Sequence, residues 1–218
     1  MNEQAKQLND WLMEQKCRAL VKALERRRFT ARFCPAAKDA AEAVIEQART
    51  AETVGFGGSL SVAELKVRER LAEQGKELLD HGRPDLTPEE KMVIMRRQLT
   101  CDLFLTGTNA VTQDGCLVNI DGNGNRVAAM IFGPKKVMIV VGRNKIVDGG
   151  IPDAYRRIKQ LASPPNAMRL NKQTPCAKTG FCADCDSPDR ICMATTVLER
   201  KPRLTDIVVL VVNEDLGL

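Results

Sequence analysis

The sequence predicts an α/β fold. Segments with apolar residues at helical spacing alternate with short, valine-rich runs that suit buried strands, and glycine, proline and asparagine turns separate them. One helix start is marked directly by a capping box, in which Thr87 and Glu90 exchange hydrogen bonds around Pro88 at the first helical position. With 218 residues, 44% of them hydrophobic, the chain is long enough to bury a substantial core.

The first quarter of the chain predicts helix, strand, helix and strand in that order. A long amphipathic helix packs one face on the body and ends at the arginines 26–28, whose charges complement the helix dipole. A strand at 29–34, an Ala- and Glu-rich helix at 36–49 and a strand at 53–56 follow. The apolar face of the first helix consists of Leu8, Trp11, Leu12, Ala19, Leu20, Ala23 and Leu24.

A glycine turn follows the strand at 53–56 and leads into a further helical pattern, within the segment VGFGGSLSVAEL. Gly57 and Gly58 lack side chains that would keep a ligand from the backbone, and Ser59 or Ser61 can cap the helix. This order suits a phosphate, carboxylate or pyrophosphate. It matches neither G-x-G-x-x-G nor the Walker A motif, so no nucleotide is indicated. A plain strand-to-helix connection is the alternative interpretation.

The middle of the chain is dominated by strands and polar turns. A strand is expected at 77–80, a helix at 88–99 and a surface turn around His81, the only histidine. The further strands are expected at 103–105, 116–120, 127–131 and 137–141. Polar residues crowd the strand ends, where open α/β sheets place ligands, although such residues also build hairpin turns. They are Thr106, Thr108, Asn109, Asp114, Asn119, Asp121 and Asn123.

The last quarter of the chain contains a helix at 152–161 that the prolines of 163–165 are expected to stop, and a buried strand at 206–213. Between them lie four cysteines with the spacing C-x5-C-x2-C-x6-C, namely Cys176, Cys182, Cys185 and Cys192. Four thiolates that converge on one point suit zinc and a [4Fe–4S] cluster alike. Redox-active thiols and reduced structural cysteines are the alternatives.

Composition argues against several classes of protein. The 33 basic and 28 acidic residues are interspersed and aromatic residues make up 4%, which disfavours nucleic-acid binding. The longest apolar runs, 137–141 and 207–212, are far shorter than the roughly 20 residues of a membrane span. The polar N-terminal segment has no signal-peptide core, so a cytoplasmic protein without membrane insertion is expected, and disulfides are disfavoured.

The glycine segment, paired with the segment TNAVTQDGCLVNIDGNGNRVAAMIFGPKKVMIVVGRNKIV, resembles the LUD-domain family of lactate-utilisation proteins. The resemblance spans residues 1–158 and the final strand. It implies a three-layer α/β/α fold around a mainly parallel sheet, similar to the sugar-phosphate isomerase and CoA-transferase superfamily. The chain is thus expected to be one domain, 1–218, with an N-terminal helical segment at about 1–50 and a cysteine-bearing insertion at about 164–194, which resembles a subgroup of the family.

The resemblance also implies a function. Family members are implicated in oxidising L-lactate with a partner subunit that carries iron–sulfur clusters. By analogy with the superfamily, the glycine loop holds an anionic ligand and Asp114 is the candidate base. The expected ligand-binding residues are Gly57, Gly58, Ser59, Asn109, Asn119 and Asp121. The alternative is a non-catalytic subunit that binds or senses a small anionic metabolite and carries a structural metal. Self-association into a homo-oligomer is left open.

Overall fold

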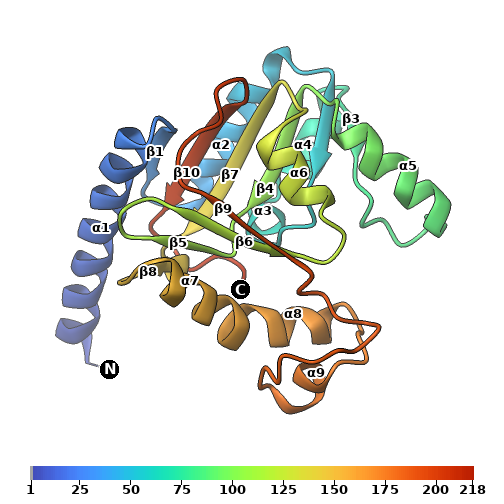
Figure 1. Cartoon of the computed structure of the whole chain (residues 1–218). Helices are drawn as coiled ribbons and strands as arrows, with labels where there is room; N and C mark the ends of the chain where they lie inside the picture. The colour runs from blue at the N-terminus through green and yellow to red at the C-terminus, as the bar shows by residue number, and fades with distance from the viewer. Residues whose placement is uncertain (1) are drawn as a thin grey trace.

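A parallel sheet of six strands, in the order β1-β10-β7-β4-β2-β3, forms the centre of the molecule (Figure 1). The computed structural model describes residues 2–218. The central strands are buried on both faces, as expected from their uninterrupted valine, leucine and isoleucine runs. The strands are β1 (Thr30–Cys34), β2 (Thr53–Phe56), β3 (Glu77–Leu79), β4 (Leu103–Gly107), β7 (Lys136–Gly142) and β10 (Asp206–Val212).

Helices cover both faces of this sheet. On one face α2 (Ala37–Gln47), α3 (Leu60–Glu64) and α4 (Val67–Glu73) pack against β2, β4, β7 and β10 through one hydrophobic cluster. On the other face α1 (Glu3–Arg26) and α6 (Asn125–Ile131) contribute to a second cluster. The predicted three-layer α/β/α fold with a mainly parallel sheet is therefore confirmed.

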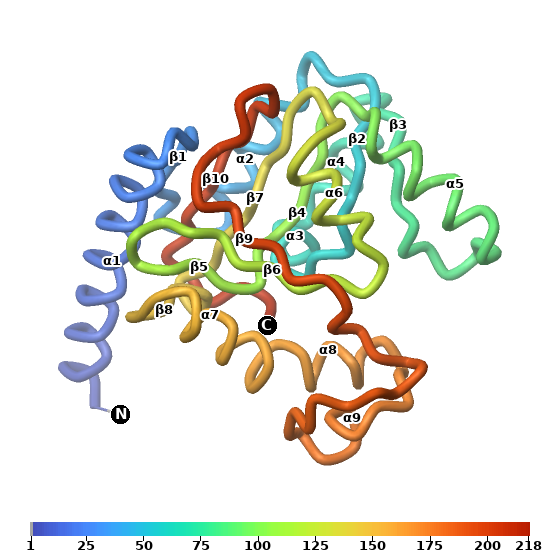
Figure 2. Tube along the Cα trace, viewed as in Figure 1, coloured from blue at the N-terminus to red at the C-terminus, as the bar shows by residue number. Residues whose placement is uncertain are grey.

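A second, four-stranded sheet lies against the side of the central sheet that carries α1 (Figure 2). Its strands are β5 (Ala110–Thr112), β6 (Leu117–Asp121), β8 (Ile146–Val147) and β9 (Ala194–Leu198). The order is β8-β5-β6-β9, and β6 pairs antiparallel with both neighbours. Helix α7 (Ile151–Arg157) contributes Ala154 to a third cluster with residues of β5 and β6.

Helix α1 differs from the prediction in its first half. Cys17, Leu20 and Leu24 are buried against the sheet, but Leu8 and Trp11 are 60% and 61% exposed. The helix projects past the end of β1, so its first turns have no sheet beneath them (Figure 1). The predicted capping box is confirmed at the start of α5 (Pro88–Gln98).

The strand predicted at 127–131 is wrong, because these residues form the helix α6. Gly124 leads into it with a φ of +81°, which glycine adopts without strain. Alanine has the highest helix propensity, and Val127 and Met130 lie three residues apart on the buried face. The polar loop before them is therefore a helix entry and no hairpin turn.

The helix stop predicted at 163–165 is also wrong. After α7 the chain forms one π-helical stretch, Ile158–Ala162, and then α8 (Ser163–Arg169). The π turn shifts the hydrogen-bond register, so Pro164 falls in the first turn of α8, where a missing N–H costs little. The continuation of the helix carries Asn166 and Arg169 beyond the second sheet.

The cysteine-bearing segment follows α8, forms the short helix α9 (Pro175–Thr179) and returns as the edge strand β9. Two 3₁₀ turns complete the elements, η1 (Ala48–Thr50) and η2 (Arg143–Lys145). Within residues 2–218 no helix combines the length and the apolarity that a bilayer crossing requires.

Candidate functional site

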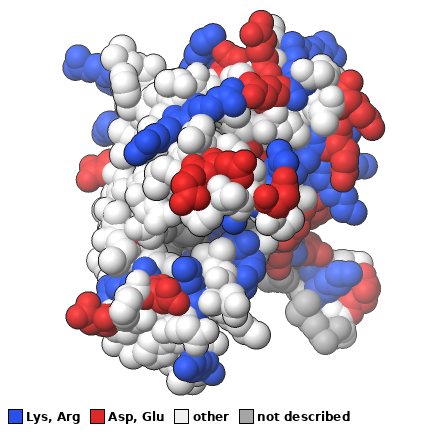
Figure 3. All heavy atoms as spheres, turned by 90° about the vertical axis from the view of Figure 1, so that its right-hand side faces the viewer, with Lys and Arg blue, Asp and Glu red and all other residues white. Residues whose placement is uncertain are grey.

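A cavity of about 720 Å³ lies where the carboxyl ends of β2, β4 and β6 meet the segment that follows α7. Viewed from the side of β3 and α5, the surface is hollowed between the main body and the lower helices, with Lys and Arg side chains beside the recess (Figure 3). The cavity wall includes six cationic side chains and two acidic ones. These are Lys91, Arg126, Lys145, Arg169, Lys172 and Arg190, with Asp121 and Asp189.

The predicted glycine turn forms one wall of this cavity. The Gly57 N–H donates to the Leu105 carbonyl at 2.9 Å, and a Cβ at Gly57 would lie only 2.8 Å from Thr106 Oγ1. Gly58 has a φ of +70°, and Ser59 caps α3 by accepting from the Val62 N–H at 3.3 Å. Since that contact uses a lone pair, the Ser59 hydroxyl hydrogen is free to donate.

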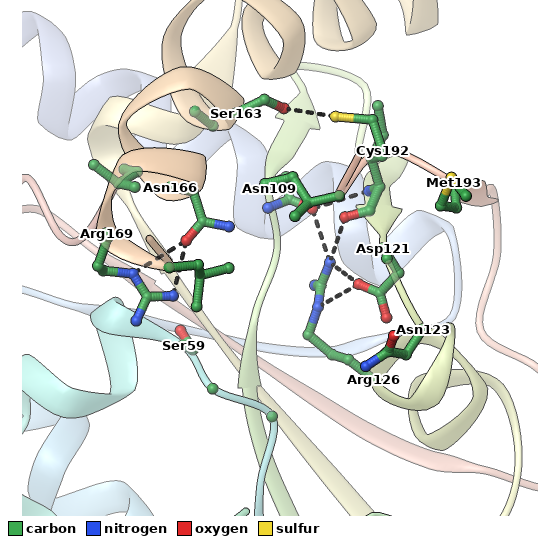
Figure 4. A pocket seen from close by; sticks show the side chains of 18 of the residues that line it. Ser59, Asn109, Asp121, Asn123, Arg126, Ser163, Asn166, Arg169, Cys192 and Met193 are labelled. Carbon is green, nitrogen blue, oxygen red and sulfur yellow. Dashed lines mark hydrogen bonds and ion pairs between the residues drawn. The ribbon is translucent and has the colours of Figure 1, made fainter. Parts of the chain in front are cut away.

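Arg126 organises the opposite wall (Figure 4). Its guanidinium donates to Asn119 Oδ1 at 2.7 Å, to Asn109 Oδ1 at 2.8 Å and to Asp121 Oδ1 at 2.9 Å. It also donates to the backbone carbonyls of Gly107 and Ile120. Five oxygens of β4, β6 and the loop after β4 thus depend on one partly buried cation, which makes Arg126 the link between β4 and β6.

The predicted ligand residues therefore divide into two groups. Gly57, Gly58, Ser59, Asn109 and Asp121 line the same cavity, so the structure brings these predicted residues together. The sixth predicted residue, Asn119, is fully buried behind the wall. Its amide oxygen accepts from Arg126, and its amide nitrogen has no hydrogen-bond partner among residues 2–218.

His81, expected in a surface turn, instead lines the cavity beside the glycine turn. A Cβ at Gly58 would lie 3.8 Å from His81 Nε2. The Gln98 amide nitrogen donates its two hydrogens to the carbonyls of Phe56 and Leu79, and it also lies 3.0 Å from His81 Nδ1. Because an amide nitrogen does not accept, a hydrogen on Nδ1 would have no acceptor there. Burial lowers the pKa of His81, although the Asp80 charge opposes this. The neutral ring therefore carries its proton on Nε2, next to the glycines.

Four cations at or behind the cavity wall have no acidic partner among residues 2–218, namely Lys91, Lys145, Arg157 and Arg169. Lys145, 5% exposed, contacts only the hydroxyl of Ser61, at 2.7 Å. Arg157 lies behind the wall and donates to the carbonyls of Asn109 and Asn144, and burial lowers its pKa. Arg169 donates to Asn166. Burial, followed by the charges of Arg157 and Arg126, lowers the pKa of Lys145 to about 7.

The cysteine-bearing segment forms another wall of the cavity through residues 188–193. Cys192 Sγ lies 3.4 Å from the Ser163 hydroxyl at the start of α8 (Figure 4). Arg190 holds the segment together by donating to the carbonyls of Cys185 and Cys192 and to Asp184. The predicted anion site and the predicted thiol site are therefore neighbours, which the sequence spacing did not indicate.

The four thiols do not form a metal site in this arrangement. All four cysteines are free and partly exposed, and Cys176 Sγ contacts Thr174 Oγ1 at 3.3 Å. Within residues 2–218 no three His, Cys, Asp or Glu side chains are grouped so that they could hold a metal ion. The donor set therefore does not fit zinc or a cluster unless the segment closes further, since thiolates bind zinc at about 2.3 Å.

The candidate base Asp114 lies elsewhere. It is in the turn between β5 and β6, pairs with Arg27, and lines a separate pocket with Asp148 and Glu199. The Thr112 hydroxyl, and then Arg27, lower the pKa of its carboxyl. The structure does not bring Asp114 to the glycine turn. The analogy with the superfamily predicts a base beside the glycine loop, and Asp114 does not occupy that place.

The fold and this cavity define an α/β protein of the three-layer type with a cation-lined site at the carboxyl edge of its parallel sheet. The chain belongs to the LUD-domain family, whose model matches residues 17–212. Membership implies a role associated with lactate utilisation. No curated protein matches the chain.

Among solved structures, a DUF162 family protein from Deinococcus radiodurans is similar, with a TM-score of 0.51 and 13% identity over 92% of this chain and 98% of that one. At this identity the likeness shows the fold. The eIF2B beta structure from Chaetomium thermophilum has a TM-score of 0.31 and 15% identity, over 53% of this chain and 49% of that one.

Proposed function

We propose that the cavity binds a small hydroxy or oxo acid such as L-lactate, and that the chain is a component of a redox system that acts on this acid. The observation that carries the proposal is the set of three cations, Lys145, Arg157 and Arg169, which have no acidic partner among residues 2–218. Of the three, Lys145 is buried, and a positive charge that is buried without a counter-charge is costly, so an anionic ligand beside Lys145 removes that cost. Arg157 is half-buried, and Arg169 lines the cavity as an exposed side chain. Family membership supports lactate as the class of ligand.

Donors for a carboxylate are available on the glycine side of the cavity. The Ser59 hydroxyl, the His81 Nε2–H and Lys145 Nζ all belong to residues of the wall, and Gly57 and Gly58 leave the backbone accessible. A cavity of about 720 Å³ is in the range for drug-sized ligands and exceeds the needs of a three-carbon acid. A second reactant has room beside the acid.

Oxidation of a hydroxy acid to an oxo acid releases two electrons and two protons, which an acceptor must take up. In the proposed system the acceptor is a partner subunit with iron–sulfur clusters, as the family resemblance implies. A [4Fe–4S] cluster or zinc on Cys176, Cys182, Cys185 and Cys192 is part of the same proposal and requires closure of their segment. Free thiols suit a reducing compartment such as the cytoplasm.

Calorimetric titration with L-lactate and pyruvate tests the binding proposal, with L-lactamide as the neutral analogue. We expect both acids to bind and the amide to bind at least about tenfold more weakly, which corresponds to about 1.4 kcal/mol. Arg169→Gln is expected to weaken both acids by a similar factor, whereas Lys38→Gln on the exposed side of α2 leaves them unchanged. Equal affinity for acid and amide, or no binding of either acid, contradicts the proposal.

The alternative is a regulatory subunit that binds the metabolite and carries a structural metal. Cys192, which forms part of the cavity wall, favours it, because a metal held by this thiol and the other three would order residues 188–193. Metal analysis after anaerobic purification separates the two. A brown protein with reducible iron and sulfide supports electron transfer, and a colourless zinc protein supports the regulatory subunit. If the purified protein contains neither iron nor zinc, the four-cysteine metal site is excluded from both functional proposals.

A further inference from the structure

Lys145 occupies a position that binding alone does not explain. It lies in η2, directly after the buried strand β7, and lines the cavity although it is only 5% exposed. Gly107 keeps the space before it open, because a Cβ there would lie 3.6 Å from Lys145 Nζ and 2.7 Å from Ser59 Oγ. The amine is thus reached from the cavity past a residue without a side chain.

The hydrogen bonds of Ser61 determine how the Lys145 amine is used. The Ser61 hydroxyl donates its hydrogen to the Leu216 carbonyl at 3.0 Å, so it can only accept from Lys145 Nζ, at 2.7 Å. This contact uses a hydrogen of the amine and leaves the nitrogen lone pair of the neutral form free. The amine is therefore held in place without loss of its nucleophilic electrons.

The surroundings favour the neutral amine. Burial is the main cause of the lowered pKa, about 7, and the charges of Arg157 and Arg126 act in the same direction, against Glu64. A lysine that is desolvated and placed near other cations is a nucleophile at neutral pH. Lys159 provides the contrast within the same chain, since it is also buried but donates to Asp184 at 3.0 Å. Burial would lower the pKa of Lys159, yet that hydrogen bond and the nearby Cys192 raise it.

We propose that Lys145 is a nucleophilic residue that condenses with the carbonyl carbon of a 2-oxo acid in the cavity and forms a Schiff base. Nζ attacks the carbonyl carbon and a C–N bond forms. The two hydrogens of the amine leave with the carbonyl oxygen as water, and a C=N bond replaces the C=O bond. No oxidant or reductant is required. The cations around the cavity select a carbonyl compound with an adjacent carboxylate. This inference rests on the proposed function, because it names the oxo acid as a covalent ligand of the same site.

Reductive trapping tests the inference. The protein is incubated with pyruvate and sodium cyanoborohydride, which reduces a Schiff base to a stable amine, and the adduct is located by peptide mass mapping. We expect one reduced pyruvate adduct, on Lys145 and not on Lys159. Lys145→Arg keeps a cation but has no nucleophilic amine of this kind, and should abolish the adduct. Adducts spread over exposed lysines, or placed on Lys159, overturn the proposal.

A second test uses only the wild-type protein, so its result does not require that a variant folds. It measures how the rate of reductive trapping changes with pH. The trapping rate should rise with a midpoint near pH 7 if Lys145 reacts, because the neutral amine is the reactive form. A midpoint near the ordinary lysine value overturns the proposal.

Two controls separate this inference from the proposed function. Pyruvate that binds in calorimetry but gives no adduct refutes the Schiff base and leaves the binding proposal intact. Acetaldehyde has a carbonyl and no carboxylate. If it is trapped on Lys145 while pyruvate neither binds nor reacts, the nucleophile is confirmed and the anion site is refuted.

Discussion

Replacing Lys145 by methionine should stabilise the protein at low pH, which is unusual for the loss of a buried hydrogen-bonded side chain. The pKa of the amine falls from 10.5 to about 7 on folding, mainly because of burial. At about 1.4 kcal/mol per pKa unit, carrying the proton inside the fold costs roughly 5 kcal/mol. Methionine has a similar length without a charge, and loses one hydrogen bond, to Ser61, worth about 1 kcal/mol. The expected gain in unfolding free energy is about 2–4 kcal/mol at pH 6.

The stability difference between Lys145→Met and the wild-type protein should depend on pH in a definite direction. Below pH 7 the amine is protonated in both the folded and the unfolded chain, and the full cost is present. Between pH 7 and 10.5 the unfolded chain holds a proton that the folded chain has released, so the wild-type protein becomes more stable as the pH rises. The advantage of Lys145→Met therefore shrinks through this window and is lost before pH 10.5, where the variant retains only the cost of the missing hydrogen bond to Ser61.

Urea denaturation of both proteins at pH 6, 7.5 and 9 measures the effect, in buffers without carboxylate or phosphate ions that could occupy the cavity. Lys159→Met is the matched control, because Lys159 is also buried but is paired with Asp184. That variant should lose stability across the same range. The reasoning is refuted if Lys145→Met is destabilised as Lys159→Met is, or if its stability difference from the wild type does not change with pH.

Four further predictions concern the framework of the site. Arg126→Met should lower the unfolding free energy by about 3–5 kcal/mol in urea, because the buried Asp121 carboxylate loses its counter-charge and four other oxygens lose a donor; a loss under 1 kcal/mol contradicts the role of Arg126. Gly57→Val should abolish ligand binding in calorimetry, since even a Cβ at this position would lie 2.8 Å from a threonine hydroxyl. Asp114→Asn should leave L-lactate affinity within about twofold, because Asp114 lies in a separate pocket; turnover lost with affinity unchanged would support its predicted role as the base. Thr87→Ala should cost about 1 kcal/mol through loss of the capping box, and an unchanged denaturation midpoint would show that the start of α5 is frayed.

Local sequence signals predicted most of the elements. Signals such as valine runs and the capping box require only neighbours along the chain, and β1, α2, β2, α5, β7 and β10 lie where they were expected. The two errors arose where a local signal was ambiguous. The segment at 127–131 has strand-like apolar residues, but it also contains two adjacent alanines, which favour helix, between Val127 and Met130 at helical spacing. The error placed Arg126 outside any helix. The prolines at 164–165 stop a regular α-helix, but the preceding π turn made them the start of a new one.

The glycine turn and several polar strand ends of the site were also predicted, because strands and glycines are recognisable in sequence. His81, Lys145 and Arg169 were missed as site residues. Nothing near them in the chain marks them, since their positions depend on parts of the fold distant in sequence. Lys145 contacts a serine 84 residues away, and burial of this amine is a property of the packed molecule.

The amino-acid order alone therefore determined the α/β class, the buried valine-rich strands and a glycine turn suited to an anion, because these follow from side-chain pattern and backbone freedom within short segments. The mainly parallel sheet was expected only from the family resemblance. The tertiary structure decided which charges meet. Strand order placed the ends of β2, β4 and β6 around one cavity and moved Asp114 to another pocket. The dielectric environment of a charged group is set by everything packed around it, so the state of Lys145 emerges only after folding.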